Sequence, residues 1–139
     1  MAAHLPDRPH RLETLDREEC LRLLSSQSVG RVGISIGALP AVLPVNFGLL
    51  GDSIVFSTGA GTKLEAATTR AVVAFEVDAY EPDGQSGWSV LVVGRSSILP
   101  GDQTNRAQAL GIAPWTSDGQ ASSFVRVQMT RATGRRLNR

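Results

Sequence analysis

A segment near the middle of the chain combines residue types that bind anions. Two hydroxyl side chains, Ser57 and Thr58, end an apolar strand pattern, and Lys63 follows the glycines Gly59 and Gly61. Hydroxyl and ammonium groups donate hydrogen bonds to phosphate oxygens, and glycine lets the backbone approach a ligand. Lys63 is also the only lysine of the chain, whose other basic residues are all arginine. The segment therefore indicates a phosphate site, while a plain strand-to-helix linker with a solvated lysine fits the local pattern equally well.

The residues that follow predict a short helix with Lys63 in its first turn. Thr62 and Glu65 have the spacing of a capping box, in which each side chain accepts a hydrogen bond from a backbone N–H of the other. We expect a helix over residues 62–70, whose free N–H groups and positive dipole end favour an anion. A Walker A phosphate loop fits less well, because it requires Gly-Lys-Ser/Thr and this chain has Gly-Thr-Lys. Nucleotide hydrolysis is therefore disfavoured.

A second candidate segment is the strand pattern that contains Pro44, Val45 and Asn46. Proline cannot donate to a sheet ladder, so this strand is predicted to have an open edge or a bulge at Pro44. Such a strand can present backbone groups and the Asn46 amide to a ring system. A bulged barrel strand with Asn46 bonded locally fits the same residues.

A third candidate segment is Trp88, Ser89 and Val90, at the start of a long strand pattern. A tryptophan there can stack on an aromatic ligand, fill a subunit interface or pack in the core. Arg31 lies in another predicted strand, opposite its apolar face, so it is either solvated or in contact with a ligand or subunit. The Asp and Glu residues show no pair at a spacing suited to acid–base catalysis.

The scarcity of histidine and cysteine restricts the chemistry further. His4 and His10 are the only histidines, and both precede the predicted domain, so no catalytic triad, histidine base or metal site is expected. Cys20 is the only cysteine, which excludes an internal disulfide and is compatible with a reducing compartment. If the protein is an enzyme, a cofactor is expected to supply the chemistry.

The length and charge of the chain favour one domain that binds neither nucleic acid nor membrane. Its 139 residues suffice for one core, and we expect a tail over residues 1–12 and a single domain over 13–139. The formal net charge of +1 provides no broad basic surface for nucleic acid. We find no signal peptide and no apolar run long enough to cross a bilayer, so a cytoplasmic protein is expected.

Hydrophobic periodicity predicts a mainly β domain with a few helices. Besides the helix at 62–70, we expect one at 17–25, capped by Asp16, and a short one near 105–110. Alternating apolar residues predict strands at 30–36, 41–47, 53–57, 72–78, 87–99 and 123–129. About six short strands joined largely by hairpins favour a small closed barrel over a parallel sheet.

Taken in order, these segments resemble the pyridoxamine 5′-phosphate oxidase-like superfamily of flavin mononucleotide (FMN)-binding split barrels, in its short bacterial branch. The resemblance extends from about residue 15 to residue 99. It implies a six-stranded, Greek-key-like split β-barrel that forms a homodimer, with two flavin sites between the subunits. It rests on the succession of Val29-Gly-Arg-Val32, Pro44-Val-Asn-Phe47, Ile54-Val-Phe-Ser-Thr58, Gly61-Thr-Lys-Leu64, Val73-Ala-Phe-Glu-Val-Asp78 and Gly87-Trp-Ser-Val90.

The resemblance also assigns roles to the candidate residues. It implies that Ser57, Thr58 and Lys63, with Leu64 beside them in the same motif, hold the FMN phosphate. It places Pro44, Val45 and Asn46 beside the isoalloxazine ring. It places Trp88, Ser89 and Val90 on the strand that the partner subunit contributes against that ring. Arg31 is the last residue of the implied cofactor site.

The resemblance implies an oxidoreductase in which hydride passes between FMN and a small organic substrate or a reduced nicotinamide. Two alternatives stay open: a reductase that uses a deazaflavin in the same groove, and a non-enzymatic module that binds flavin or haem. After residue 99 the chain is shorter than the vitamin-synthesising oxidases, and a pyridoxal-type substrate does not follow.

Overall fold

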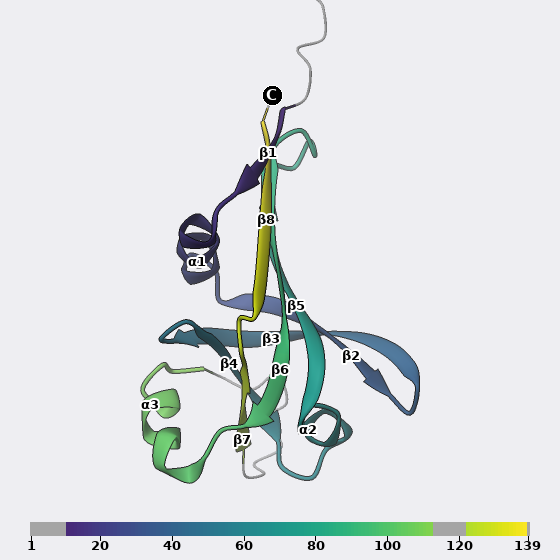
Figure 1. Ribbon diagram of the computed structural model, residues 1–139, viewed down its shortest axis with the longest axis vertical. Coiled ribbons are helices and arrows are strands. Elements are labelled where there is room, and N and C mark those ends of the chain that lie inside the picture. Colours follow the sequence, from purple (N-terminus) through teal and green to yellow (C-terminus); the bar gives the residue numbers. More distant parts are fainter. Residues whose placement is uncertain (1–10, 113–121, 139) are drawn as a thin grey trace, which may run out of the picture.

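The computed structural model describes residues 11–112 and 122–138, which form one antiparallel sheet with three short helices (Figure 1). The strand order is β1-β8-β6-β5-β2-β3-β4-β7. The strands are β1 (Arg11–Leu15), β2 (Val29–Ile36), β3 (Leu39–Leu50), β4 (Ser53–Gly59), β5 (Ala71–Tyr80), β6 (Gly87–Ile98), β7 (Ser122–Val127) and β8 (Arg131–Asn138).

The long strand β6 closes the sheet into a barrel because it changes partner along its length. Its first part, from Gly87 to Val93, pairs with β8, and its last part, from Ser96 to Ile98, pairs with β7. Since β7 also pairs with β4, strands β2 to β7 form a closed six-stranded antiparallel barrel. This confirms the predicted fold class. The strands β8 and β1 continue the sheet beyond the barrel, along the long axis of the molecule (Figure 1).

The barrel interior is filled by side chains that alternate along the strands. Phe75 lies at its centre, with ring centroids 5.1 Å from Phe47 and 6.1 Å from Phe56. Around these rings lie further buried aliphatic side chains: Val32, Ile34, Val45, Ile54, Val73, Val77, Val90, Val92, Val125 and Val127. The opposite face of β4 and β7 packs in a second, smaller cluster of Val55, Leu99, Ala107 and Phe124.

Two helices pack against the barrel, one on its core cluster and one on the second cluster. Helix α1 (Arg17–Ser25) has the predicted bounds and the predicted cap, since the Asp16 side chain accepts a hydrogen bond from the Glu19 N–H at 2.9 Å. The Glu19 carboxylate also accepts a 2.6 Å bond from Arg136, which attaches α1 to β8. Hydrogen bonds from Arg22 and Arg136 lower the pKa of Glu19 to about 2. Helix α3 (Thr104–Gln108) contributes Ala107 to the second cluster.

Several sequence predictions need correction. Helix α2 (Lys63–Ala67) is shorter than the predicted 62–70, with Thr62 as its N-cap. Strands β1 and β8 were not predicted, and β1 begins at Arg11, inside the predicted tail 1–12, whose residues 1–10 lie outside the described part. The β8 sequence lacks a regular apolar alternation, and its pairing with β6 and β1 provides the backbone hydrogen bonds that its own pattern does not predict.

In the part of the chain that the structure describes, no helix is long and apolar enough to cross a membrane.

Candidate cofactor site

Strands β3 and β4 stop pairing where the candidate residues begin. Their ladder runs from Leu50 opposite Ser53 to Phe47 opposite Phe56, and no further pair follows. On its other edge, β4 stays paired with β7 as far as Gly59. The next residues of the two separating strands are Val45 and Asn46 on β3 and Ser57 and Thr58 on β4. The fold therefore places the second candidate segment beside the first, at the point where the two strands separate.

Ser57 and Thr58 have buried hydroxyl groups without hydrogen-bond partners. Their residues are only 8% and 3% exposed, and neither Ser57 Oγ nor Thr58 Oγ1 has a partner among the described residues. Phe56 belongs to the barrel core and Val55 to the second cluster, so alternation directs Thr58 inward and Ser57 outward. The two hydroxyls therefore leave opposite faces of β4. An unsatisfied buried polar group costs about 1–3 kcal/mol, which a ligand that accepts its hydrogen bond would recover.

Lys63 is exposed at the first position of α2 and forms no ion pair with any residue in the described ranges. The predicted capping box is present: Thr62 Oγ1 accepts from the Glu65 N–H at 3.1 Å, and Glu65 accepts from the Gly61 N–H at 3.0 Å. A hydrogen bond from Ser123, followed by that from Gly61, lowers the pKa of Glu65. The Gly61 N–H is therefore not free for a ligand, and the five-residue α2 adds little dipole, so an anion at this place would be bound mainly by side chains.

Three of the predicted cofactor residues have side chains that belong to the core. Val45 is 4% exposed and Val90 is fully buried, while Leu64 packs against the same core cluster. Strand alternation explains the first two, because each lies between residues of the outer face. A ligand could reach Val45 and Val90 only through their backbone. Pro44 is exposed and Asn46 is half-buried, both on the outer face beside β2.

Arg31 faces outward from β2 and is engaged by two acids. Its Nη1 lies 3.4 Å from Asp78 Oδ2 and 3.6 Å from Glu76 Oε1. Register places Arg31 between Pro44 on β3 and Glu76 on β5. The guanidinium is about half exposed, so it lies next to the Pro44 strand but directs its charge toward β5.

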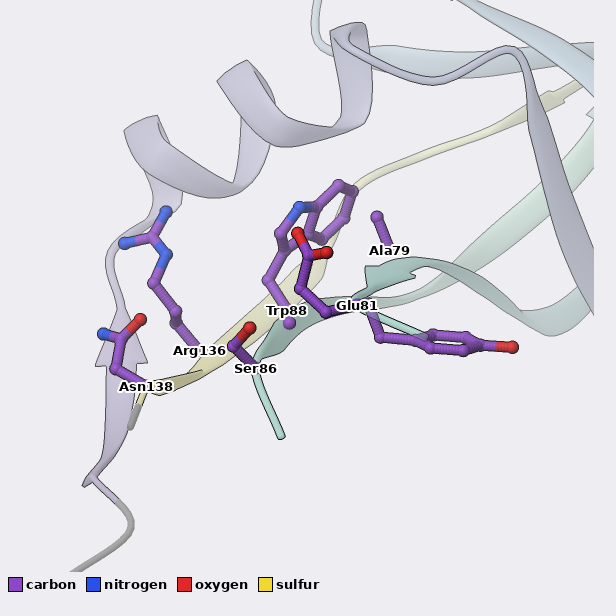
Figure 2. Close-up of a pocket in the computed structure, with 8 residues that line it drawn as sticks. Ala79, Glu81, Ser86, Trp88, Arg136 and Asn138 are labelled. Carbon is purple, nitrogen blue, oxygen red and sulfur yellow. The ribbon is translucent and has the colours of Figure 1, made fainter. Parts of the chain in front are cut away.

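Trp88 and Ser89 lie at the far end of the molecule from Lys63. Trp88 is half-buried, packs against the core and pairs with Ala79 on one side and Arg136 on the other. It borders a pocket of about 270 Å³ with Arg136 and Tyr80 (Figure 2). In Figure 1 this end of β6 is at the top, whereas α2 is at the bottom. A single chain therefore does not bring the Trp88 segment to Ser57 and Lys63.

The structure also shows an acidic pair that the sequence analysis missed. Glu76 and Asp78 are two residues apart on β5 and thus share one face. Burial, followed by the hydrogen bond and the charge of Asp78, raises the pKa of Glu76 to about 7, against the opposing effect of Arg31. The alternation of these acids with Phe75 and Val77 was the available signal for this pair.

Comparison with known proteins identifies the family. The family model described as pyridoxamine 5′-phosphate oxidase matches residues 16–136. The chain belongs to this family. The match confirms the resemblance inferred from the ordered segments, and it extends past residue 99 into β8.

Relatives with a closely similar sequence or fold include several from mycobacteria. The uncharacterized protein Rv0080 of Mycobacterium tuberculosis is 32% identical over 95% of this chain and 90% of its own length. The FAD binding protein of Mycobacterium smegmatis is 31% identical with a TM-score of 0.76, over 91% of this chain and 98% of that one. The FAD and heme binding protein of the same species, 16% identical with a TM-score of 0.72, shares the fold over 87% and 71%.

Proposed function

We propose that this family member binds FMN with the phosphate near Thr58, Ser57 and Lys63, and acts as a flavin-dependent oxidoreductase. The observation that supports the site is the pair of buried, unpartnered hydroxyls near the only lysine of the chain. A phosphate accepts hydrogen bonds from hydroxyls and from an ammonium group, so at the end of β4 it would satisfy whichever of the two hydroxyls faces it. Bound flavin would supply hydride chemistry, and the protein would orient it and shield one ring face.

The separation of β3 from β4 suggests where the ring lies. Pro44 and Asn46 are on the outer face of β3, next to the end of β4 that carries Ser57. A ring beside this strand would contact the proline and the amide, with the phosphate toward Lys63. The Trp88 strand of the same chain is too distant to cover that ring, which favours a contribution from a second copy.

We therefore propose a homodimer formed through the outer sheet face, the outward surface of β1, β8, β6, β5, β2 and the adjoining part of β3. Large apolar side chains are exposed there, which is typical of an interaction surface. Arg31 and Arg135 lie on the same face as Glu76 and Asp78, so this face carries charges of both signs. The exposed apolar residues are Leu12, Val42, Val72, Tyr80 and Leu91.

FAD is the second candidate cofactor, because the FAD binding protein of M. smegmatis is 31% identical over nearly its whole length. FAD has a diphosphate where FMN has a single terminal phosphate, so the same hydroxyls could serve either. A deazaflavin carrier is a further alternative, in which Arg31, Arg95 and the pair at 135–136 would contact its acidic tail. Arg31 and Arg136 already pair with carboxylates, so Arg95 and Arg135 are the better candidates. Haem has less support, since His4 and His10 precede the family-matched residues 16–136.

The spectrum of the purified protein tests the cofactor proposal. We expect flavin absorption bands, and mass spectrometry of the material released on denaturation should give the mass of FMN. Titration of flavin-free protein with FMN, FAD and a deazaflavin should rank FMN first, and bound FMN should be reduced by a reduced nicotinamide. A protein that binds none of the three would contradict the proposal. A preference for FAD or the deazaflavin would show that this molecule, and not FMN, is the cofactor.

Replacing Thr58 with valine should stabilise the flavin-free protein and weaken flavin binding. The change removes an unpartnered buried hydroxyl and keeps the side-chain shape, so we expect a gain of about 1–3 kcal/mol in the free energy of unfolding. Urea unfolding and FMN titration would measure the two effects.

Thr68→Val is the matched control, because Thr68 is equally buried but donates a 2.7 Å bond to the Leu64 carbonyl. It should lose about 0.5–1.5 kcal/mol of stability. If Thr58→Val behaves like Thr68→Val and retains normal flavin affinity, the Thr58 hydroxyl has a structural partner and no ligand.

A further inference from the structure

The acidic pair on β5 lies at the centre of the outer sheet face. Glu76 pairs in register with Arg31 on β2 and with Leu91 on β6. Three hollows in the face border its side chain, with volumes of about 380, 320 and 490 Å³. Any partner that covers this face therefore covers Glu76 and Asp78.

The carboxyl groups of Glu76 and Asp78 lie close together on this face, since Arg31 Nη1 is 3.6 Å from Glu76 Oε1 and 3.4 Å from Asp78 Oδ2. A proton on one carboxyl lets it donate a hydrogen bond to the other, whereas two ionised carboxylates can only accept. Like charges at this distance disfavour double ionisation, and pairs of this kind hold one proton to higher pH than a single carboxyl.

The surrounding groups neutralise the negative charge of this pair only in part. Within residues 11–112 and 122–138, Arg31 is the cation paired with Glu76, but its Nη1 is 3.6 Å from Glu76 Oε1, too far for a hydrogen bond. That oxygen is buried with no hydrogen-bond partner in the same ranges. Arg135 on β8 borders two of the hollows together with Glu76. Tyr80, at the end of β5, borders one of these two. The facing residues of β6 and β1 along these hollows are Ser89, Leu91, Leu12 and Thr14, none of which carries a charge.

We propose that Glu76 and Asp78 share one proton inside the subunit interface, and that its loss at alkaline pH weakens the dimer. This inference rests on the proposed dimer through the outer sheet face. A second copy removes water from the pair, which makes the doubly ionised state more costly in the dimer than in the separated chain.

The sign of the pH dependence follows from proton binding. The pKa of Glu76 in the single chain is already raised to about 7, and burial by a partner raises it further. Well below pH 7 the pair holds its proton in both states, and association does not depend on this group. Above pH 7 the separated chain releases the proton that the dimer retains, so association weakens as the pH rises.

Sedimentation equilibrium of the full chain between about pH 6 and pH 9 tests the inference. We expect the dimer dissociation constant of the wild type to rise roughly tenfold or more from about pH 6.5 to about pH 8.5. The dimer contains two such pairs, and a tenfold change equals a shift of about one pKa unit summed over both. Glu76→Gln keeps a donor toward Asp78 and carries no charge, so its constant should stay nearly unchanged. Asp78→Asn should also flatten the profile.

Glu18→Gln is the control, because Glu18 is exposed on α1 and away from this face. Its dimer dissociation constant should change with pH as that of the wild type does. A wild-type dimer whose constant does not change with pH would overturn the inference and leave the dimer proposal standing. A pH response that persists unchanged in both Glu76→Gln and Asp78→Asn would overturn it as well. A wild type that is monomeric at every pH would contradict the dimer itself.

Discussion

Replacing Lys63 with alanine should weaken FMN binding by roughly 1.5–3 kcal/mol, about 10- to 150-fold, the range for a hydrogen bond to a charged group. Lys63 is exposed and has no ion-pair partner in the described ranges, so the change should leave the folded chain intact. Isothermal titration of flavin-free protein with FMN and with riboflavin would measure the loss. Riboflavin lacks the phosphate, so its affinity should not change.

Arg17→Ala is the matched control for the loss of one positive charge. Arg17 is exposed and lies 3.8 Å from Asp52, at the turn that precedes β4, whereas Lys63 follows the other end of that strand. It should bind FMN as the wild type does. Equal losses in the two variants would indicate a general electrostatic effect, and an unchanged affinity in Lys63→Ala would place the phosphate elsewhere.

Replacing Gly94 with alanine should destabilise the fold by about 3 kcal/mol or more. Gly94 lies where β6 leaves β8 and approaches β7, and an added Cβ would be 1.7 Å from the Gln128 carbonyl oxygen. Backbone cannot move aside as a flexible side chain can. The Gln128 N–H also donates to the Arg95 carbonyl at 2.9 Å, so the clash would break the junction that closes the barrel.

Urea unfolding would measure this loss, with Gly33→Ala as the control. An added Cβ at Gly33 would meet the Ala74 Cβ at 3.5 Å, an ordinary contact, so its stability should stay within about 1 kcal/mol of the wild type. Similar stabilities for the two variants would show that β6 can separate from the β7–β8 connection at little cost.

The order of the central elements could be predicted from local sequence alone. Helix α1 was predicted with its observed bounds, because an N-cap acid and an apolar stripe are encoded within one short segment. The strands that line the barrel alternate apolar and polar residues because one face is buried, and this pattern does not depend on the pairing partner. The family resemblance followed from the succession of these segments and is confirmed by the match over residues 16–136.

The availability of each candidate side chain was decided by tertiary structure. Alternation alone cannot tell which face of β3 or β6 points into the barrel, and pairing places Val45 and Val90 in the core while it leaves Pro44 and Ser89 on the outer face. The pairing of β8 likewise depends on β6 and β1, partners distant in sequence.

The residue types of segment 57–63 were sufficient to indicate an anion site, since its hydroxyls, its glycines and its single lysine are visible in the sequence itself. Only the folded chain shows that both hydroxyls are buried without partners and that the Gly61 N–H is already bonded to Glu65. It also shows the Glu76–Asp78 pair on the outer sheet face. Burial and hydrogen-bond satisfaction depend on contacts between distant segments, which is why local sequence could name the candidates but not determine their surroundings.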